Sequence, residues 1–151
     1  LLDEVIAESL RHISRKHDEY TIVTKCEELI LVRMDVQLII QVLVNLIDNA
    51  IKYTPKGSKI CIRGIKCNGK AQICVEDNGP GIADEMKPYI FEMFYTGKST
   101  IADSQRSLGL GLSLCQSIIE AHDGRLLLTD NTPRGCIFTF TLPLSEVTLN
   151  E

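Results

Sequence analysis

The pattern of apolar and polar positions predicts one long amphipathic helix over residues 35–53. Apolar side chains recur there every three or four residues, the spacing that places them on one face of an α-helix. Asp35 is a suitable N-cap, and the proline of Thr54-Pro-Lys-Gly57 restricts the residue before it and ends the helix. We expect this helix to pack on a large core. Its apolar arc consists of Ile39, Val42, Leu43, Leu46, Ile47 and Ala50.

Three polar residues form a stripe beside that arc. Asn45, Asn49 and Lys52 are spaced at i, i+4 and i+7, which places them within roughly 60° of one another on a helix. A half-buried amide without a partner costs about 1–3 kcal/mol, so these side chains should face hydrogen-bonding groups or a ligand. Amide oxygens can bind Mg²⁺, and an ammonium group suits a phosphate chain. The alternative, judged from the helix alone, is that both asparagines cap neighbouring loops.

The rest of the chain alternates between strand-like and helix-like patterns. Asn68-Gly69 between two alternating segments predicts a β-hairpin with a tight turn. Residues 95–108 show no periodicity, which indicates a long functional or mobile loop. This order predicts an α+β fold, a two-layer sandwich of a mixed, mainly antiparallel sheet with helices on one face, rather than a Rossmann sheet. The expected strands are 20–26, 29–32, 59–66, 71–77, 125–129 and 137–142, and the other expected helical segments are 2–13, short turns within 83–94, and 109–122.

Composition places the chain among ordinary globular proteins. Its 151 residues, 44% apolar and 24% charged, fit one domain (1–144) with a C-terminal tail (145–151). The formal net charge of −4 and the lack of tryptophan argue against a nucleic-acid surface. No apolar run approaches the ~20 residues of a membrane span, and we expect no direct membrane contact. Because the chain starts at Leu1 without methionine, we interpret it as a piece of a longer polypeptide.

The cysteines indicate neither zinc nor disulfides. The six of them form no C-x-x-C pair, so the zinc pattern is absent. Four lie inside apolar patterns, where a free thiol behaves as a small hydrophobic group; these are Cys61, Cys74, Cys115 and Cys136. We therefore expect reduced thiols and a cytosolic location.

Two glycine motifs are candidate ligand sites. Asp77-Asn-Gly79-Pro-Gly81 follows a strand, where glycines let the backbone approach a flat ligand and a carboxylate can accept the amino group of adenine. Gly109-Leu-Gly111 precedes a helical pattern, the arrangement that offers backbone N–H groups to phosphate. Taken singly, the first also occurs in plain turns and the second also permits close helix packing. Neither is a Walker loop.

In this order, the motifs resemble one family. The asparagine-bearing helix, the D-x-G-x-G strand end, the segment Phe91-Glu-Met-Phe94-Tyr, the loop and the G-x-G helix look like the N, G1, F and G2 boxes of the catalytic, ATP-binding domain of sensor histidine kinases. That domain has the Bergerat fold, shared with DNA gyrase B, heat-shock chaperone ATPases and mismatch-repair ATPases. The resemblance covers residues 35–143, and the tract 94–122 further resembles the potassium-responsive KdpD branch.

The resemblance implies a role for each matching residue. Asn49 would bind the Mg²⁺ that bridges the ATP phosphates, with Asn45 beside it, and both would act in catalysis with Lys52. Asp77 would bind the adenine amino group. Residues 95–108 would be a lid that orders when nucleotide binds. Further nucleotide-binding positions implied by the family are Tyr53, Gly79, Gly81, Ile82, Lys98, Ser107, Leu108, Gly109, Leu110, Gly111, Leu112 and Thr139.

Position 45 bears on the choice between kinase and ATPase. The superfamily's ATP hydrolases carry a glutamate one turn before the metal-binding asparagine, and this chain has Asn45, a poor base. Phosphoryl transfer needs mainly positioning and charge neutralisation, so this favours a kinase. The chain departs from the family pattern at Thr96, Ser107 and Asp123, where relatives commonly have Arg, Gly and Gly. The alternatives are an ATP hydrolase or serine kinase of the same superfamily, and a non-catalytic nucleotide-sensing module.

The phosphoacceptor is missing from this sequence. His12, His17 and His122 lack the H-box context of the family. The resemblance therefore implies a histidine on an upstream dimerisation domain, to which residues 1–16 would partly be the linker, and a response regulator as the next partner. It also implies a cytoplasmic domain of a bacterial membrane sensor.

Overall fold

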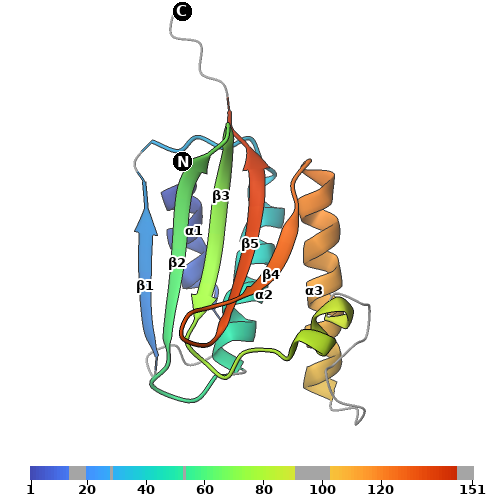
Figure 1. Ribbon diagram of the computed structural model, residues 1–151. Helices are drawn as coiled ribbons and strands as arrows, with labels where there is room; N and C mark the ends of the chain where they lie inside the picture. Colours follow the sequence, from blue (N-terminus) through green and yellow to red (C-terminus); the bar gives the residue numbers. More distant parts are fainter. Residues whose placement is uncertain (14–19, 28, 53, 91–102, 146–151) are drawn as a thin grey trace, which may run out of the picture.

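The computed structural model describes residues 1–13, 20–27, 29–52, 54–90 and 103–145 (Figure 1). Its helices are α1 (Leu2–Arg11), α2 (Val36–Lys52), the 3₁₀ helix η2 (Asp84–Tyr89) and α3 (Asp103–Ala121). Its strands are β1 (Thr21–Cys26), β2 (Lys59–Cys67), β3 (Lys70–Asp77), β4 (Leu126–Asp130) and β5 (Cys136–Pro143). No described helix is both long enough and apolar enough to cross a membrane.

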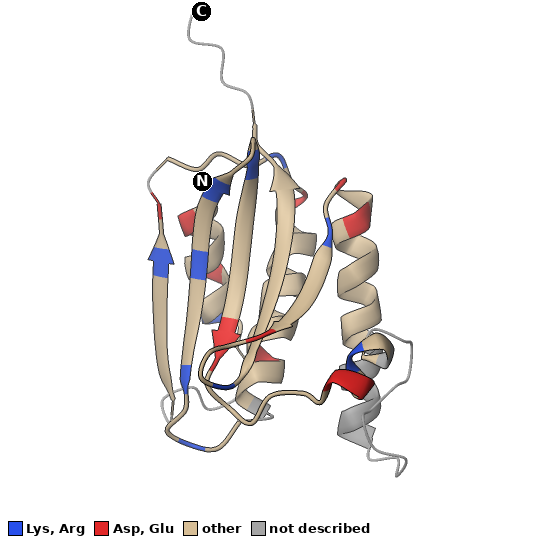
Figure 2. Cartoon of the chain, in the orientation of Figure 1, with Lys and Arg blue, Asp and Glu red and all other residues tan. Residues whose placement is uncertain are grey.

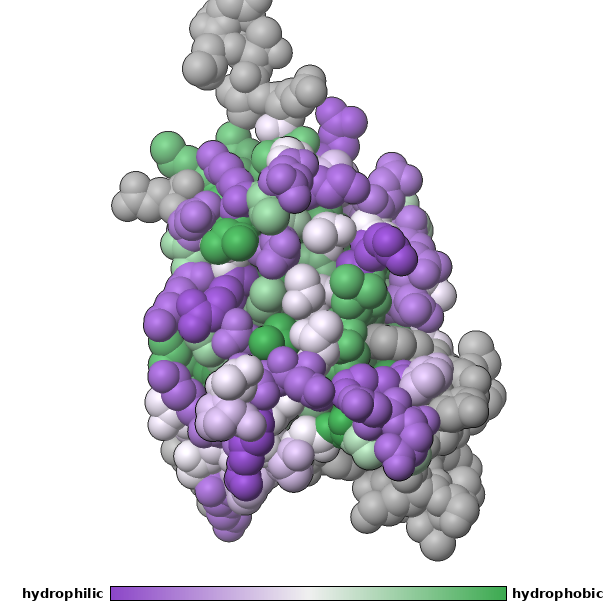
Figure 3. Space-filling view, viewed as in Figure 1, coloured by the Kyte–Doolittle hydropathy of each residue, from purple (hydrophilic) through white to green (hydrophobic). Residues whose placement is uncertain are grey.

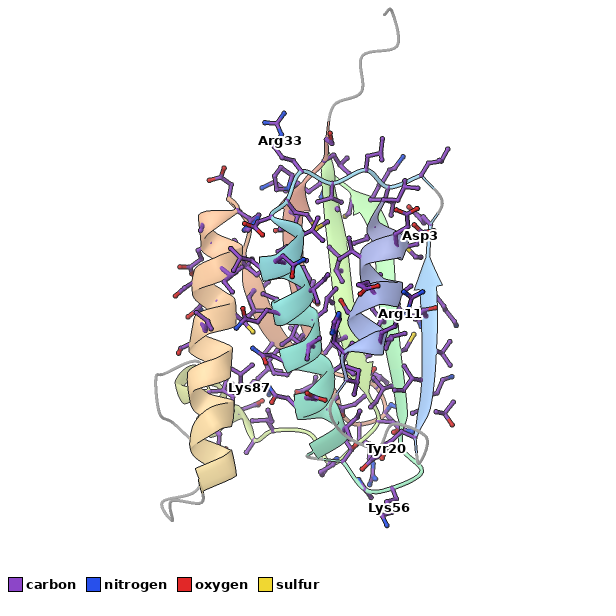
Figure 4. The ribbon with its side chains drawn as sticks, turned by 180° about the vertical axis from the view of Figure 1, so that it is seen from behind. Asp3, Arg11, Tyr20, Arg33, Lys56 and Lys87 are labelled. Carbon is purple, nitrogen blue, oxygen red and sulfur yellow. The ribbon has the colours of Figure 1, made fainter. Side chains whose placement is uncertain are left out.

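The described strands form one sheet with the order β1-β2-β3-β5-β4. β1 runs parallel to β2, and the other neighbouring strands are antiparallel. α1 and α2 lie behind this sheet in Figure 1, and all three α-helices lie in front of it in the reverse view of Figure 4. The predicted α+β sandwich with helices on one face is confirmed.

Alternation along the strands gives the sheet a buried face and an open face. In β3 every second residue from Ala71 to Asp77 is buried, because these side chains point toward the helices. Burying each large apolar side chain stabilises the fold by about 1.5–3 kcal/mol. The largest fully buried side chains include Ile39, Leu43, Leu46, Ile47, Ile60, Ile62, Ile73 and Phe140.

The open face carries a mixture of polar and apolar side chains (Figure 3). Arg63 of β2 and Glu76 of β3 form an ion pair across it, with Nε and Oε2 2.7 Å apart. Figure 2 shows further basic positions along β2. This face therefore differs in character from the apolar layer between the sheet and the helices.

Local signals set two element boundaries as predicted. The Asp35 carboxylate accepts a hydrogen bond from the Leu38 N–H at 3.2 Å, and the Asp35 carbonyl accepts one from the Ile39 N–H at 3.0 Å. Asn68 and Gly69 both have positive φ, 54° and 78°, as a two-residue hairpin turn with the twist of the strands requires. The N-cap and hairpin predictions are confirmed.

One predicted strand and one predicted helix boundary are wrong. Residues 29–32 form no strand, because Leu29 has φ of 60° and Val32 makes only an isolated bridge with Leu144. The third helix begins at Asp103, not at Gly109, so residues 103–108 belong to α3 rather than to the expected loop. Nothing between Asp103 and Gly109 blocks a helix, and an acidic residue suits its positive N-terminal end. Residues 91–94 of the expected helical turns, residues 95–102 of the expected loop and residues 146–151 of the expected tail lie outside the described residues.

Candidate functional site

Asn45 of α2 faces α3. Its Nδ2 donates to the Cys115 Sγ at 3.6 Å. A Cβ on Gly111 would lie 3.6 Å from the same Nδ2, so the glycine allows α3 to pass close to this amide. Cys115 is fully buried. The structure therefore brings the asparagine stripe and the second glycine of the G-x-G motif together, although they are far apart in the sequence.

Asn49 lies one turn further along α2 and carries an unsatisfied group. Its side-chain nitrogen Nδ2 is buried and has no hydrogen-bond partner among the described residues. Such a group costs about 1–3 kcal/mol unless something binds it. Lys52 is the last residue of α2, but its side chain lies outside the described part, as does Tyr53. A buried amide without a described partner supports the interpretation that this stripe faces a ligand.

Asp77 ends β3 on the buried face of the sheet, with 8% of its surface exposed. Its Oδ1 accepts hydrogen bonds from the Gly79 N–H at 2.9 Å and from the Cys136 N–H at 3.3 Å. Burial raises the pKa of this carboxyl, and the two backbone hydrogen bonds oppose that rise. Both bonds use Oδ1, so the second oxygen of the carboxylate has no hydrogen-bond partner among the described residues and can accept a hydrogen bond from a ligand.

The turn between β4 and β5 supports Asp77 from one side. Asn131 Nδ2 donates to the Asp77 carbonyl oxygen at 2.8 Å, and a Cβ on Gly135 would lie only 1.9 Å from that oxygen. Gly81, with φ of 84°, packs against the same turn. A Cβ added to Gly81 would lie 3.5 Å from the Gly135 carbonyl oxygen. Sequence reasoning missed Asn131, Gly135 and Cys136, since the only signal was a turn-like composition.

The Asp77 turn also touches the end of α2. Thr54 Cγ2 lies 2.4 Å from the position that a Cβ on Gly79 would occupy. The Thr54 side chain is buried and its Oγ1 donates to the Ala50 carbonyl at 2.7 Å. The asparagine helix therefore contacts the G-x-G helix at Gly111, and Thr54, just beyond the end of the same helix, contacts the D-x-G-x-G turn at Gly79.

These two contacts join the motifs of one protein family, and the family model for histidine kinase-, DNA gyrase B- and HSP90-like ATPases matches residues 34–146. The chain belongs to this family. It is the catalytic, ATP-binding domain of a sensor histidine kinase.

Similar proteins support the assignment. The chain is 40% identical over 144 residues to the sensor protein KdpD of Clostridium acetobutylicum, covering 95% of this chain and 16% of the relative. It is 43% identical over 119 residues to the adaptive-response sensory kinase SasA of a Nostoc species, covering 78% of this chain and 29% of the relative. It therefore spans less than a third of either relative.

Solved histidine kinase structures have the same fold. The catalytic domain of histidine kinase ThkA matches with a TM-score of 0.81 and 32% identity, covering 94% of this chain and 93% of that domain. ThkA in complex with the response regulator protein TrrA matches with a TM-score of 0.78 and 32% identity, covering 95% of this chain and 40% of that chain.

In this histidine kinase domain, α3 carries the remaining G-x-G positions. Because Gly109 and Gly111 lie beyond the first turn of α3, their N–H groups are those that an α-helix uses in its own hydrogen bonds. The expectation that this motif starts a helix and offers its N–H groups to phosphate is therefore wrong for this structure. Leu112 is 1% exposed and belongs to the core. Ser107, Leu108, Gly109 and Leu110 have backbone positions in α3 and no described side chains, and Lys98 lies outside the described residues.

Of the two remaining residues expected at the nucleotide site of the kinase domain, Ile82 lies near Asp77 and Thr139 does not. Ile82 is partly buried and packs against the core close to the Asp77 turn. Thr139 lies on the open face of the sheet, where its Oγ1 is 3.4 Å from Cys74 Sγ. Phe138 and Phe140 alternate with it and point to the helix side, as Asp77 does. The structure therefore does not bring Thr139 into the site.

Lys87 holds the segment after Gly81 of the kinase domain against β4. Its Nζ contacts Asp84 of the same 3₁₀ helix and lies 2.8 Å from Oδ1 of Asp130 at the end of β4. The hydrogen bonds to Asp130 and Asp84 raise the pKa of Lys87 to about 12. Figure 4 labels this residue. The ammonium group therefore stays charged at neutral pH and links two segments that flank the Asp77 turn.

Two buried thiols of the kinase domain are expected to resist alkylation. Burial, reinforced by the Asp77 and Asp130 charges, raises the pKa of Cys136 to about 12, and burial raises that of Cys115 to about 11. Because the thiolate is the nucleophile, only about one Cys136 in 10⁴ is reactive at pH 8. Iodoacetamide labelling followed by peptide mass spectrometry should modify the half-buried Cys67 before Cys115 and Cys136. Equal labelling rates for Cys67 and Cys136 would contradict the burial.

Proposed function

We propose that this domain passes the γ-phosphoryl group of Mg·ATP to a histidine on a separate dimerisation domain, from which it reaches an aspartate of a response regulator. The observation that carries the proposal is the contact of α2 with both glycine motifs. Asn45 packs against Gly111, and Thr54 packs against Gly79 beside Asp77. One purine triphosphate lying along α2 would meet Asp77 at its adenine end and the amides near its phosphates.

The donor groups of α2 fit a magnesium ion shared with ATP. Mg²⁺ typically takes one or two protein oxygens and completes its shell with waters and substrate phosphates. Asn49 would supply an amide oxygen, and its unsatisfied Nδ2 could then donate to a phosphate or water. Bound Mg²⁺ would neutralise charge on the phosphates. Lys52, Tyr53, Lys98, Ser107 and Leu108 would contact the ribose and phosphates as the family resemblance implies. Gly111 would instead act by letting α3 pass close to Asn45, and Leu112 by packing in the core.

The described histidines support an acceptor on another domain. Both ring nitrogens of His122 are engaged, Nδ1 with the Ile118 carbonyl at 2.8 Å and Nε2 as acceptor of the Asp35 N–H at 3.0 Å. His12 lies on the surface beside Glu8, with 3.1 Å between Nε2 and Oε2. Neither ring is directed toward the Asn45 and Asp77 contacts described above, whereas a histidine brought by a dimerisation domain could approach the phosphate end.

The other parts of the proposal follow from the relatives. ThkA has been solved with a response regulator, and we propose a response regulator as the partner of the protein that contains this domain. We also propose that this protein is a KdpD-like bacterial membrane sensor whose kinase domain lies in the cytoplasm. Asn45 in place of a catalytic base favours the kinase over the ATP hydrolase alternative.

Replacing Asn49 by alanine is expected to abolish the magnesium dependence of ATP binding. Removing an amide whose nitrogen has no described partner should leave the thermal unfolding temperature unchanged or raised, because no hydrogen bond of that nitrogen is lost and the cost of burying it is relieved. ATP titrations by calorimetry, with Mg²⁺ and with EDTA, measure the effect. Gln41→Ala, on an exposed position of α2, is the matched control.

Mixing the chain with ATP and the dimerisation domain of a KdpD-type relative then tests transfer. Labelled phosphohistidine on that domain supports the proposal. Its absence, when the relative's intact kinase labels itself, would contradict it. Steady ATP hydrolysis that Asn45→Ala removes would instead identify an ATP hydrolase, and ATP binding without transfer or hydrolysis a nucleotide sensor.

A further inference from the structure

Thr54 occupies the point where the end of α2 meets the Asp77 turn. It is 8% exposed, and its two branches do different things. The hydroxyl donates to the Ala50 carbonyl at 2.7 Å and so completes the last turn of α2. The methyl group Cγ2 fills the space that a Cβ on Gly79 would need, 2.4 Å from that position. Among the described residues, it is this methyl branch that packs most closely against the turn that carries Asp77.

Tyr20 holds Thr54 from the other side. Its hydroxyl group lies 2.9 Å from the carbonyl oxygen of Ile51, in the last turn of α2, and 3.0 Å from that of Thr54, just beyond the helix. Figure 4 shows Tyr20 at the lower end of β1, beside the end of α2. A helix leaves its last carbonyls without internal partners, so this hydroxyl fixes where the helix ends. The position of Thr54 is thus defined from both α2 and the sheet edge.

Gly79 in turn is tied to the carboxylate. Its N–H donates to Asp77 Oδ1 at 2.9 Å, so a displacement of Gly79 moves or releases that oxygen. A chain of contacts therefore runs from Asn49 through the last turn of α2 to Thr54, Gly79 and Asp77. It connects the amide that faces the phosphate end with the carboxylate that faces the adenine end.

We propose that the Thr54 methyl group is a positioning element that sets the separation of the two ends of the nucleotide site. The inference rests on the proposed ATP-binding roles of Asn49 and Asp77. Packed interiors transmit small displacements because they contain few voids. Loss of one methyl at this contact would let the Asp77 turn move relative to α2, and a ligand that must reach both ends would bind less well.

Separate variants distinguish the methyl group from the hydroxyl group. Thr54→Ser keeps the helix hydrogen bond and removes the contact with Gly79. We expect it to weaken ATP binding roughly tenfold, by analogy with catalytic rates, which fall up to about a hundredfold when a group is misplaced by about 1 Å. Thr54→Val keeps the methyl contact and loses the hydrogen bond, and should lower the unfolding temperature more than it changes ATP affinity. Ser9→Ala is the control for Thr54→Val, because it removes an equivalent hydrogen bond in α1, from Ser9 Oγ to the Val5 carbonyl at 2.8 Å.

A methyl exchange gives the sharpest test. Gly79→Ala alone places its Cβ against Thr54 Cγ2 and should lose ATP affinity roughly tenfold or more. Combined with Thr54→Ser, the new methyl group fills the space left by the old one, and ATP affinity should return to within a few-fold of the unmodified chain. The nearest remaining contacts of the new Cβ, Thr54 Cβ at 3.1 Å and Asp77 Oδ1 at 3.2 Å, require shifts of only tenths of an ångström.

The outcomes are read from calorimetric ATP titrations alongside thermal melts of each variant. Recovery of ATP affinity in the double variant supports the inference. Additive losses in the double variant, or a larger loss in Thr54→Val than in Thr54→Ser, would overturn it. If the unmodified chain itself binds no ATP, the proposed function fails; if it binds ATP and Thr54→Ser binds equally well, only the positioning role fails.

Discussion

Asp77→Asn is expected to lower ATP affinity roughly 10- to 100-fold, the equivalent of the 1.5–3 kcal/mol of a hydrogen bond to a charged group. The asparagine keeps an oxygen that can accept from the N–H groups of Gly79 and Cys136, as Asp77 Oδ1 does now. It replaces the second oxygen with an NH₂ group, which would point a donor at the amino group of adenine. Calorimetric titration with ATP measures the loss.

The same substitution should leave the unfolding temperature at pH 7 unchanged or slightly raised. Burial raises the pKa of the Asp77 carboxyl in the folded state above its unfolded value. Ionised Asp77 therefore costs stability above the unfolded pKa of about 4, and the cost grows as the pH rises through the folded pKa. Asparagine cannot ionise and so removes that cost.

Glu76→Gln is the matched control for Asp77→Asn. It makes the same change of charge at the adjacent residue, but on the open face, where Glu76 pairs with Arg63. ATP affinity should not change in this variant. Equal losses of affinity in both variants would show a general electrostatic effect, and an Asp77→Asn chain that melts early yet binds ATP normally would show a structural role for Asp77.

Gly135→Ala is expected to destabilise the fold by about 3 kcal/mol or more and to lower the unfolding temperature by roughly 6–12 °C. The residue has φ of 114°, and an added Cβ would lie 1.9 Å from the Asp77 carbonyl oxygen and 2.8 Å from its carbonyl carbon. Both atoms belong to backbone, so they cannot move aside cheaply. Because Asp77 itself must shift, ATP affinity should fall together with stability.

Gly57→Ala is the control for Gly135→Ala, because it separates the cost of a positive φ from the cost of a steric clash. Gly57 also has a positive φ, 86°, but nothing lies within 4 Å of a Cβ built there. Only the cost of the left-handed backbone remains, roughly 1–2 kcal/mol, and ATP affinity should be unaffected. Thermal melts of the two variants measure the difference. Equal decreases in melting temperature would contradict the close packing of the β4–β5 turn on Asp77.

Much of the site could be predicted because its chemistry is encoded in short local patterns. The asparagine spacing of α2, the carboxylate at the end of β3 and the turn at Asn68-Gly69 depend on residues within a few positions of one another. Thr139 was grouped with the nucleotide site by resemblance, yet it lies on the opposite face of the sheet from Asp77. Which face a strand residue takes depends on register, and register is set by the neighbouring strands.

By itself, the sequence determined the types of the main elements and the presence of the family's motifs, because helix and strand periods and glycine turns are local properties. Only the tertiary structure decided how the motifs meet. The support of Asp77 by Asn131 and Gly135, the approach of Asn45 to Gly111 and the contact of Thr54 with Gly79 each join residues distant in the chain. Such contacts arise when several elements pack on one core, and no local pattern records which atoms will then be neighbours.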